Sequence, residues 1–249
     1  MSFVQDLKKR AEEVGFVGVG VTSPENLIGL PYGKVWTGYT LRSPEEEFSG
    51  TRSVILLAYY VWDRAFNIMV DSARLSCSGG HTGLVKEKGD SFQLYAEVMR
   101  SKAWSLVDYL RKSGFESKPS LAIPLKTSAV RCGLGCQGKN TLLIHPKYGP
   151  MVRLISVLTK AELDADQPFG TDLCMDCQRC IDACPTGALE PYKLKINRCM
   201  TYAAENLSAE DVGEGIRRLE GKLVPRPTAC SYVECTLCID VCPIGKGRI

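Results

Sequence analysis

The sequence predicts an α+β protein with two regions, and two observations carry this prediction. Over the first two-thirds of the 249 residues, segments with helical and with strand patterns both occur, without the regular alternation that a parallel sheet requires. Near Gly170 the composition changes: beyond it cysteines dominate and the expected elements become short. We therefore expect one domain at 1–168 and a second at 169–249.

The elements of the first domain follow from their apolar patterns. Apolar residues recur at helical spacing over 3–14, and Gly15 follows where a helix would end. The segments FVGVGV from Phe16 and SVILLAYYV from Ser53 are rich in β-branched and aromatic residues, which predicts strands. Residues 62–89 carry glycine, serine and charged residues without a period, which predicts a long loop.

Three further elements are expected. An apolar residue recurs every three or four positions over 91–112, which predicts a helix. The stretch 140–159 predicts two strands joined by a turn at 146–150. In the second domain, 208–221 is the one convincing helix.

Composition and charge restrict the class of protein. With 45% hydrophobic residues and no low-complexity tract, the chain can build a core. A net charge of +3 without a basic stripe argues against nucleic acid as a partner. The N-terminus lacks the apolar stretch of a secretory signal, and the longest apolar run, 54–62, is too short to cross a bilayer. We expect a cytoplasmic protein without membrane contact.

The cysteines point to metal chemistry. Twelve cysteines in a reducing compartment indicate metal or redox sites and not a disulfide framework. The run CxxCxxCxxxCP at 174–185 has the spacing of bacterial ferredoxins, in which three cysteines bind one 4Fe-4S cluster and the fourth binds another. The segment ECTLCIDVCP repeats the last three positions, but Tyr232 occupies the first. The eighth thiolate must come from Cys199 or Cys230.

Exchange of the fourth ligand defines two cysteine sets. The ligands expected for the first cluster are Cys174, Cys177, Cys180 and Cys242. Those expected for the second are Cys184, Cys235 and Cys238, with Cys199 or Cys230. Two zinc sites are the alternative, although zinc sites typically show paired CxxC knuckles without these cysteine–proline endings.

The segment RCGLGCQGKNTLLIHPKYGPMVRLISVLT, directly before the cysteine run, resembles the core of the epoxyqueuosine reductases and the related reductive dehalogenases. The shared features are GLGxxGKN at 133–140, the YGP turn at 148–150, Arg153, CPTGA at 184–188 and RCMTY at 198–202. The resemblance covers about residues 122–245. It implies a cobalamin-dependent enzyme with two 4Fe-4S clusters and a nitroreductase-like first domain, and it selects Cys199 as the eighth ligand.

The resemblance also implies site residues around a cobalamin bound without a histidine below the cobalt. The residues expected to contact it are Gly133, Gly135, Gly138, Lys139, Asn140, Tyr148 and Arg153. The glycines would let the backbone approach a planar cofactor, with turn formation as their alternative role. Lys139, Tyr59 and Tyr60 are candidate proton donors, with a surface position for the lysine and core packing for the tyrosines as alternatives.

The sequence departs from both groups. Epoxyqueuosine reductases carry a proton-donating aspartate shortly before the GLG element, but no aspartate occurs here between Asp108 and Asp164. The helical-repeat extension that such reductases use with tRNA is not expected in this short form, nor is the export signal of the dehalogenases. We therefore leave the substrate open.

Several cysteines and histidines have no assigned role. Cys132 and Cys136 flank the glycine element. Redox activity is one role for these thiols, and simple burial as small residues is the alternative. His145 and His81 are expected in a turn and a loop, and a third metal at Cys77 and His81 is a minor alternative.

Three functions are consistent with these observations. In the first, a low-potential donor such as ferredoxin or flavodoxin reduces the clusters, and cobalamin then reduces a small substrate. In the second, the chain transfers electrons to a separate corrinoid protein and holds no corrinoid. In the third, the first domain holds flavin, although Gly15, Gly18 and Gly20 do not form a GxGxxG loop.

Overall fold

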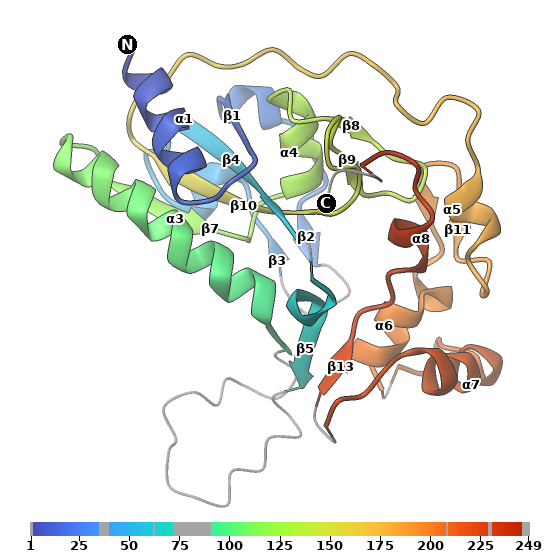
Figure 1. Ribbon diagram of the computed structural model, residues 1–249. Coiled ribbons are helices and arrows are strands. Elements are labelled where there is room, and N and C mark those ends of the chain that lie inside the picture. The colour runs from blue at the N-terminus through green and yellow to red at the C-terminus, as the bar shows by residue number, and fades with distance from the viewer. Residues whose placement is uncertain are drawn as a thin grey trace, which may run out of the picture.

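A four-stranded antiparallel sheet organises the first domain of the computed structural model, which describes residues 2–34, 40–61, 63–71, 91–207, 209–228 and 231–245 (Figure 1). The strand order is β1 (Gly18–Thr22), β4 (Ser53–Tyr60), β10 (Val152–Thr159) and β7 (Ser117–Ser120). Strands β4 and β10 pair along their whole length, from Ser53 opposite Thr159 to Tyr60 opposite Val152.

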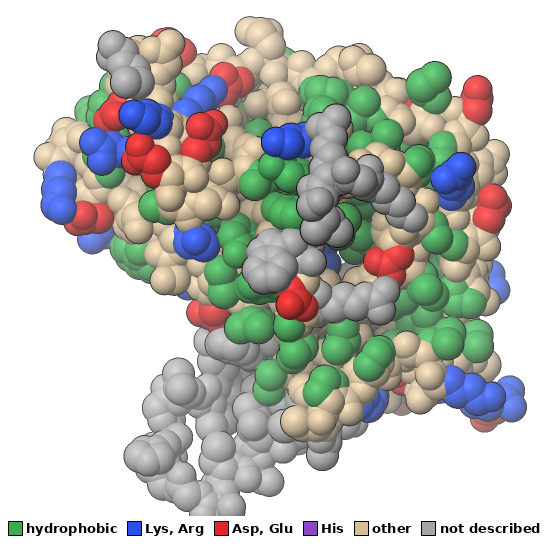
Figure 2. All heavy atoms as spheres, viewed as in Figure 1, with side chains coloured by type: hydrophobic (Ala, Val, Ile, Leu, Met, Phe, Trp, Pro, Cys, Tyr) green, Lys and Arg blue, Asp and Glu red, His purple; other side chains and the backbone are tan. Residues whose placement is uncertain are grey.

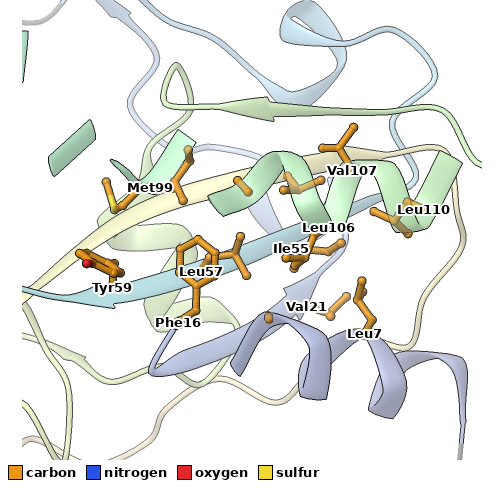
Figure 3. Packing of buried hydrophobic residues seen from close by; sticks show 14 of the residues in the cluster. Leu7, Phe16, Val21, Ile55, Leu57, Tyr59, Met99, Leu106, Val107 and Leu110 are labelled. Atoms are coloured by element: carbon orange, nitrogen blue, oxygen red, sulfur yellow. The ribbon is translucent and has the colours of Figure 1, made fainter. Parts of the chain in front are cut away.

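Helices cover both faces of this sheet, which explains why β4 and β10 are almost continuously apolar. On one face, α1 (Phe3–Glu13) and α3 (Leu94–Lys112) pack residues such as Leu7 and Leu106 against Ile55 and Leu57 (Figure 3). On the other face, α4 (Leu125–Arg131) packs against the sheet, and Ala129 lies in the same cluster as Leu154.

The expected helix at 3–14 is confirmed and has clear boundaries. Ser2 caps α1 in a capping box with Gln5, and Gly15 follows its end with a φ of 101°. The helix expected at 91–112 begins at Leu94, because the three residues before it form strand β6 (Ser91–Gln93).

A second sheet joins the two expected domains. Its order is β13 (Ser231–Val233), β5 (Ile68–Asp71) and β6, so a strand from the cysteine-rich region pairs with strands of the first region. The expectation of a loop over 62–89 is therefore wrong for β5 and for the 3-10 helix Arg64–Asn67 before it. Residues 72–90 lie outside the described residues.

The stretch 140–159 contains two strands, but they do not pair with each other. Strand β9 (Leu143–Ile144) pairs with β8 (Cys136–Gln137), whereas β10 pairs with β4 and β7. A bridge between His145 and Gly149 closes the turn between β9 and β10, as the sequence predicts.

The cysteine-rich region consists of short elements (Figure 1). They are α5 (Arg179–Asp182), β11 (Leu189–Glu190), β12 (Lys193–Leu194), the 3-10 helix Ile196–Arg198, α6 (Met200–Glu205), α7 (Glu214–Leu223) and α8 (Leu237–Asp240). The helix expected at 208–221 is confirmed as the shorter α7, and α6 is an addition.

The remaining elements of the first domain are the 3-10 helix Glu25–Leu27, β2 (Gly33–Lys34), β3 (Thr40–Leu41) and α2 (Pro44–Glu47).

After β10, an extended segment crosses the molecule to the cysteines (Figure 1). Two hydrogen bonds hold it: Asp166 N–H donates to the Val21 carbonyl, and Phe169 N–H donates to the Val130 carbonyl. Among the described residues, no helix is long and apolar enough to span a membrane.

Candidate iron-sulfur site

Four cysteines line one cavity beside α5 and α8. They are Cys174, Cys177, Cys180 and Cys242, which is the set that the ferredoxin spacing predicts for the first cluster. Three come from the loop before α5 and from α5 itself, and Cys242 comes from the turn after α8. Asn140, Ile144 and Arg179 also line the cavity.

Charges within this set of four thiols raise the pKa of two of its members. Burial raises the pKa of Cys180, and the charges of Cys174 and Cys177 raise it further. Burial likewise raises the pKa of Cys242, again with contributions from the other three thiols. Ionising four such thiols together is unfavourable without positive charge between them. Bound iron supplies that charge, so this donor set fits a 4Fe-4S cluster.

A second set of thiols gathers from three separate segments. Burial raises the pKa of Cys235, and the charges of Cys199 and Cys184 add to this shift. The pKa of Cys238 is raised to about 12 by burial, then by the charges of Cys235, Cys199, Cys180 and Cys184. Cys199, the residue before α6, thus stands with the other three. Cys230 lies outside the described residues.

The two sets adjoin, and the loops that carry them differ in their exposure to solvent. The charge of Cys180, from the first set, contributes to the pKa of Cys238 in the second. Met175, between two cysteines of the first set, has 72% of its surface exposed. Leu237, between two cysteines of the second set, has 37% of its surface exposed. The loop of the first set is therefore the more exposed of the two, although all eight thiols are half-buried.

The predicted glycine element packs against protein atoms. Gly133 has a φ of 82°, and a Cβ there would lie 2.7 Å from the Gln167 carbonyl oxygen. At Gly135, with a φ of 156°, a Cβ would collide with the Ile144 carbonyl. At Gly138 it would meet the side chain of Ile144. These contacts support the turn and packing role on the side of the backbone where a Cβ would project.

Lys139 and Asn140 reach the two cysteine loops. Lys139 is 9% exposed, and its Nζ donates to the Met175 carbonyl at 2.6 Å. Its backbone N–H points to Cys174 Sγ at 3.5 Å. Asn140 Nδ2 donates to the Cys238 carbonyl at 3.3 Å. The end of the glycine element thus faces the cysteines, and these contacts do not support Lys139 as a proton donor to a substrate.

The predicted tyrosines occupy opposite faces of β4. Tyr59 packs in the core edge-to-face with Phe16 and Phe66, which supports the packing alternative. Tyr60 lies against Tyr148, with ring centroids 4.8 Å apart. Since Tyr60 is only half-buried, it remains a candidate proton donor.

His145 is a turn residue, as the sequence predicts. Its ring lies against Tyr148, and its Nδ1 accepts the backbone N–H of Lys147 at 3.1 Å and of Tyr148 at 3.3 Å. Burial lowers its pKa, so the ring is neutral near pH 7. His81 and Cys77 lie outside the described residues.

A hollow of about 170 Å³, partly open to solvent, separates the ends of β4 and β10 from the cysteine loop at α8. Its lining consists of Val61, Asp63, Asn67, Met151, Arg153, Thr236, Ile239 and Asp240. Three of these lie between Cys235 and Cys242, so the hollow adjoins the second cysteine set.

Figure 2 shows hydrophobic side chains gathered over the middle of one face of the molecule, with charged side chains concentrated over α1.

Arg153, predicted as a cofactor contact, is held by a buried network at this hollow. Its Nη2 donates to Asn67 Oδ1 at 2.7 Å and to Glu234 Oε2 at 3.1 Å, and its guanidinium lies over the Tyr95 ring. Burial alone would lower the pKa of Arg153, but the charge of Glu234 and other neighbours outweighs burial and raises it.

Lys126, at the start of α4, was not identified from the sequence. Its side chain reaches solvent, yet burial among protein atoms is the main cause that lowers its pKa, followed by the charge of Arg153. The charges of Cys238 and Cys199 act in the opposite direction. Both observations fit a side chain in a concave part of the surface. No sequence pattern singles out this lysine, which lies seven residues before Gly133.

The two thiols beside the glycine element are both buried. Cys132 lies under Gly20, and burial raises its pKa to about 12, so it is an inert thiol. Cys136 Sγ accepts the Leu173 N–H at 3.4 Å, and burial raises its pKa also. The role as small buried residues is supported for both.

The fold and the two cysteine sets define a protein with a ferredoxin-like, two-cluster region. In agreement, residues 173–245 match the family model "4Fe-4S double cluster binding domain".

Known relatives of the chain carry the names that the sequence resemblance predicts. An epoxyqueuosine reductase of Listeria monocytogenes is 27% identical over 268 residues, covering 98% of this chain and 65% of the relative. A tetrachloroethene reductive dehalogenase of Dehalobacter restrictus is 39% identical over 170 residues, covering 64% of this chain and 28% of the relative. The predicted resemblance is therefore confirmed.

The fold also agrees with a solved structure. A crystal structure of epoxyqueuosine reductase with an epoxyqueuosine-modified tRNA-Tyr stem loop has a TM-score of 0.71 and 22% identity, covering 98% of this chain and 66% of that one. The chain thus spans less than two-thirds of the length of these relatives.

Proposed function

We propose that the protein is an iron-sulfur oxidoreductase that passes electrons, one at a time, through two 4Fe-4S clusters to an acceptor in the hollow beside the second cluster. The observation that carries this proposal is the grouping of eight cysteines into two adjoining sets of four. Such an arrangement is typical of electron-transfer domains. The family model of the double-cluster domain supports it.

The positions of the two sets indicate a direction of transfer. The first set lies beside the exposed loop around Met175, where an electron donor can approach. The second set adjoins the hollow through Thr236, Ile239 and Asp240. We therefore place the entry of electrons from a low-potential ferredoxin or flavodoxin at the first cluster, and their exit at the second.

Cobalamin is our candidate for the acceptor, within a first domain of the nitroreductase-like type. When bound, it would supply a reducible metal for a reductive reaction on a small substrate. At about 170 Å³ the hollow is too small to enclose a cobalamin, but Arg153 and Asn67 offer donors, and Asp63 and Asp240 offer acceptors, to the amide edge of a corrinoid lying across its opening. Of the residues that the sequence predicts as contacts, however, only Arg153 lines the hollow, so the hollow and not the glycine element is the proposed site.

Two alternatives have specific support. The missing aspartate and the packed glycine element favour a chain that reduces a separate corrinoid protein, and flavin stays a lesser alternative. The sequence argued against nucleic acid, but the related reductase was crystallised with a tRNA stem loop, so a tRNA substrate is also a candidate.

The test is anaerobic reconstitution with iron and sulfide, followed by gel filtration with and without added cobalamin. Co-elution of about one corrinoid per chain, with a changed corrinoid spectrum, is the expected result. Lys126→Met removes a charge that acts on Arg153 of the hollow and should weaken uptake, whereas Lys112→Met on the exposed end of α3 should not. Loaded clusters without corrinoid uptake would favour the electron-transfer alternative, and a released yellow chromophore would favour flavin. Retention of a modified tRNA stem loop in the same column experiment would support the tRNA substrate.

A further inference from the structure

The backbone around Lys139 is unusual in its conformation. Thr141, Met175 and Tyr192 have positive φ angles of 64°, 42° and 62°, and they are the only such non-glycine residues among those the structure describes. Residues other than glycine rarely adopt a positive φ, because the Cβ then crowds the backbone. Its use at these three positions indicates that the surrounding structure requires this conformation.

All three residues are tied to one short turn. Thr141 N–H donates to the Gly138 carbonyl at 2.8 Å, and Tyr192 N–H donates to the Lys139 carbonyl at 3.2 Å. The Met175 carbonyl accepts from Lys139 Nζ at 2.6 Å. Three segments far apart in sequence therefore take up a disfavoured backbone conformation around the same lysine. We call this group the Lys139 junction.

The junction contacts the first cysteine set directly. The Lys139 N–H points to Cys174 Sγ at 3.5 Å, and Asn140, the next residue, lines the cavity of that set. The carbonyl that Lys139 Nζ contacts belongs to Met175, between the first two cysteines. The ammonium group is thus fixed beside the loop that would hold the cluster.

Burial decides which nearby charge dominates. Lys139 is 9% exposed, so its charge is weakly screened. Asp172 accepts the Cys174 N–H at 2.8 Å and the Tyr192 hydroxyl at 2.9 Å, but it is exposed, so water and salt screen its charge. Lys139 is therefore a buried cation beside the first set, whereas Asp172, Asp176 and Arg179 in the same loop are exposed.

We infer that Lys139 is a positioning residue that raises the reduction potential of the first cluster. Reduction adds a negative charge to the cluster, and cluster potentials respond to nearby charge and to hydrogen bonds on the sulfurs. A fixed buried ammonium stabilises the reduced form. This makes the cluster with the more exposed loop easier to reduce by an external donor, and it gives Lys139 a role other than proton donation to a substrate. The inference rests on the proposed function only for the presence of the clusters.

The test compares lysine variants by redox titration of the reconstituted protein, followed by electron paramagnetic resonance. Lys139→Met removes the charge, Lys139→Gln removes it but keeps a hydrogen-bond donor for Met175, and Lys139→Arg keeps both. Lys193→Met is the matched control, since that lysine belongs to the same region but is 73% exposed. We expect the Met and Gln variants to lower the equilibrium constant for reduction of one cluster at least tenfold, about 59 mV for one electron. The Arg variant and the control should keep the wild-type potential.

Each result bears on the inference. Wild-type potentials in a fully loaded Lys139→Gln variant would overturn it, as would an equal shift of both clusters in that variant. If Lys139→Met does not bind a full complement of iron, the Gln variant decides alone. Absence of iron from the wild-type protein would contradict the proposed function instead, so the two failures are distinguishable.

Discussion

The ion pair between Arg153 and Glu234 gives the sharpest test of how the two regions are held together. Arg153 comes from β10 of the central sheet, and Glu234 comes directly before Cys235. Both side chains are 14% exposed. Glu234 N–H also donates to the Asn67 carbonyl at 3.0 Å, next to the pairing of β13 with β5. Glu234→Leu leaves the guanidinium buried, with Asn67 and the Tyr95 ring as its remaining partners in this network.

Removing one partner of a buried pair typically costs about 3–5 kcal/mol. For a chain of this size each kcal/mol lowers Tm by about 2–4 °C, so we expect a fall of roughly 6–20 °C. The assay is thermal unfolding of the anaerobically reconstituted protein, with iron counted in each variant. The double variant Arg153→Met with Glu234→Leu should recover most of the loss, because apolar residues often replace a buried pair without penalty. A single variant within 2 °C of wild type, which is less than the roughly 6 °C expected, or a double variant no better than the single, would refute this reasoning.

Three further predictions follow from individual residues. Cys199→Ser should reduce the iron content from about eight to about four atoms per chain, because Cys199 lies with the second set. Cys132→Ala, outside both sets, should keep about eight. Unchanged iron in Cys199→Ser would mean that another residue is the eighth ligand. Gly135→Ala should lower Tm, because its φ is 156° and its Cβ would meet the Ile144 carbonyl, whereas Gly170→Ala, with nothing within 4 Å, should not; equal Tm values would contradict the packing role. Burial lowers the pKa of His145, so the unfolded chain binds its proton at a higher pH and stability should fall as the pH drops below about 6.5. In His145→Gln the fall of Tm between pH 7.5 and 5.5 should be smaller, and an identical pH profile would exclude this linkage.

The sequence was informative where local geometry decides the outcome. The helix α1 was predictable from its apolar spacing and Gly15, and the buried strands were predictable from runs of β-branched residues. The cysteine sets were predictable for a similar reason: a cubane cluster restricts the spacing of its thiolates, and the exchange of fourth ligands connects two runs. The structure brings together the same four cysteines that this rule groups for the first cluster.

Other features depend on contacts that the sequence does not encode locally. The pairing of β13 with β5 joins segments about 160 residues apart, which no local pattern specifies. Glycines at 133, 135 and 138 suggested positions where a Cβ does not fit, but the sequence did not tell whether a cofactor or the protein occupies that space. In the structure, Gln167 and Ile144 lie where the Cβ atoms would project. Lys126 and Glu234 were invisible because their importance comes from neighbours distant in sequence.

The central claim is that this chain holds two 4Fe-4S clusters on two sets of cysteines. Analysis of iron and acid-labile sulfide in the anaerobically reconstituted protein tests it most directly. We expect about eight iron and eight sulfide per chain. A preparation that binds about two zinc ions and no sulfide would contradict it.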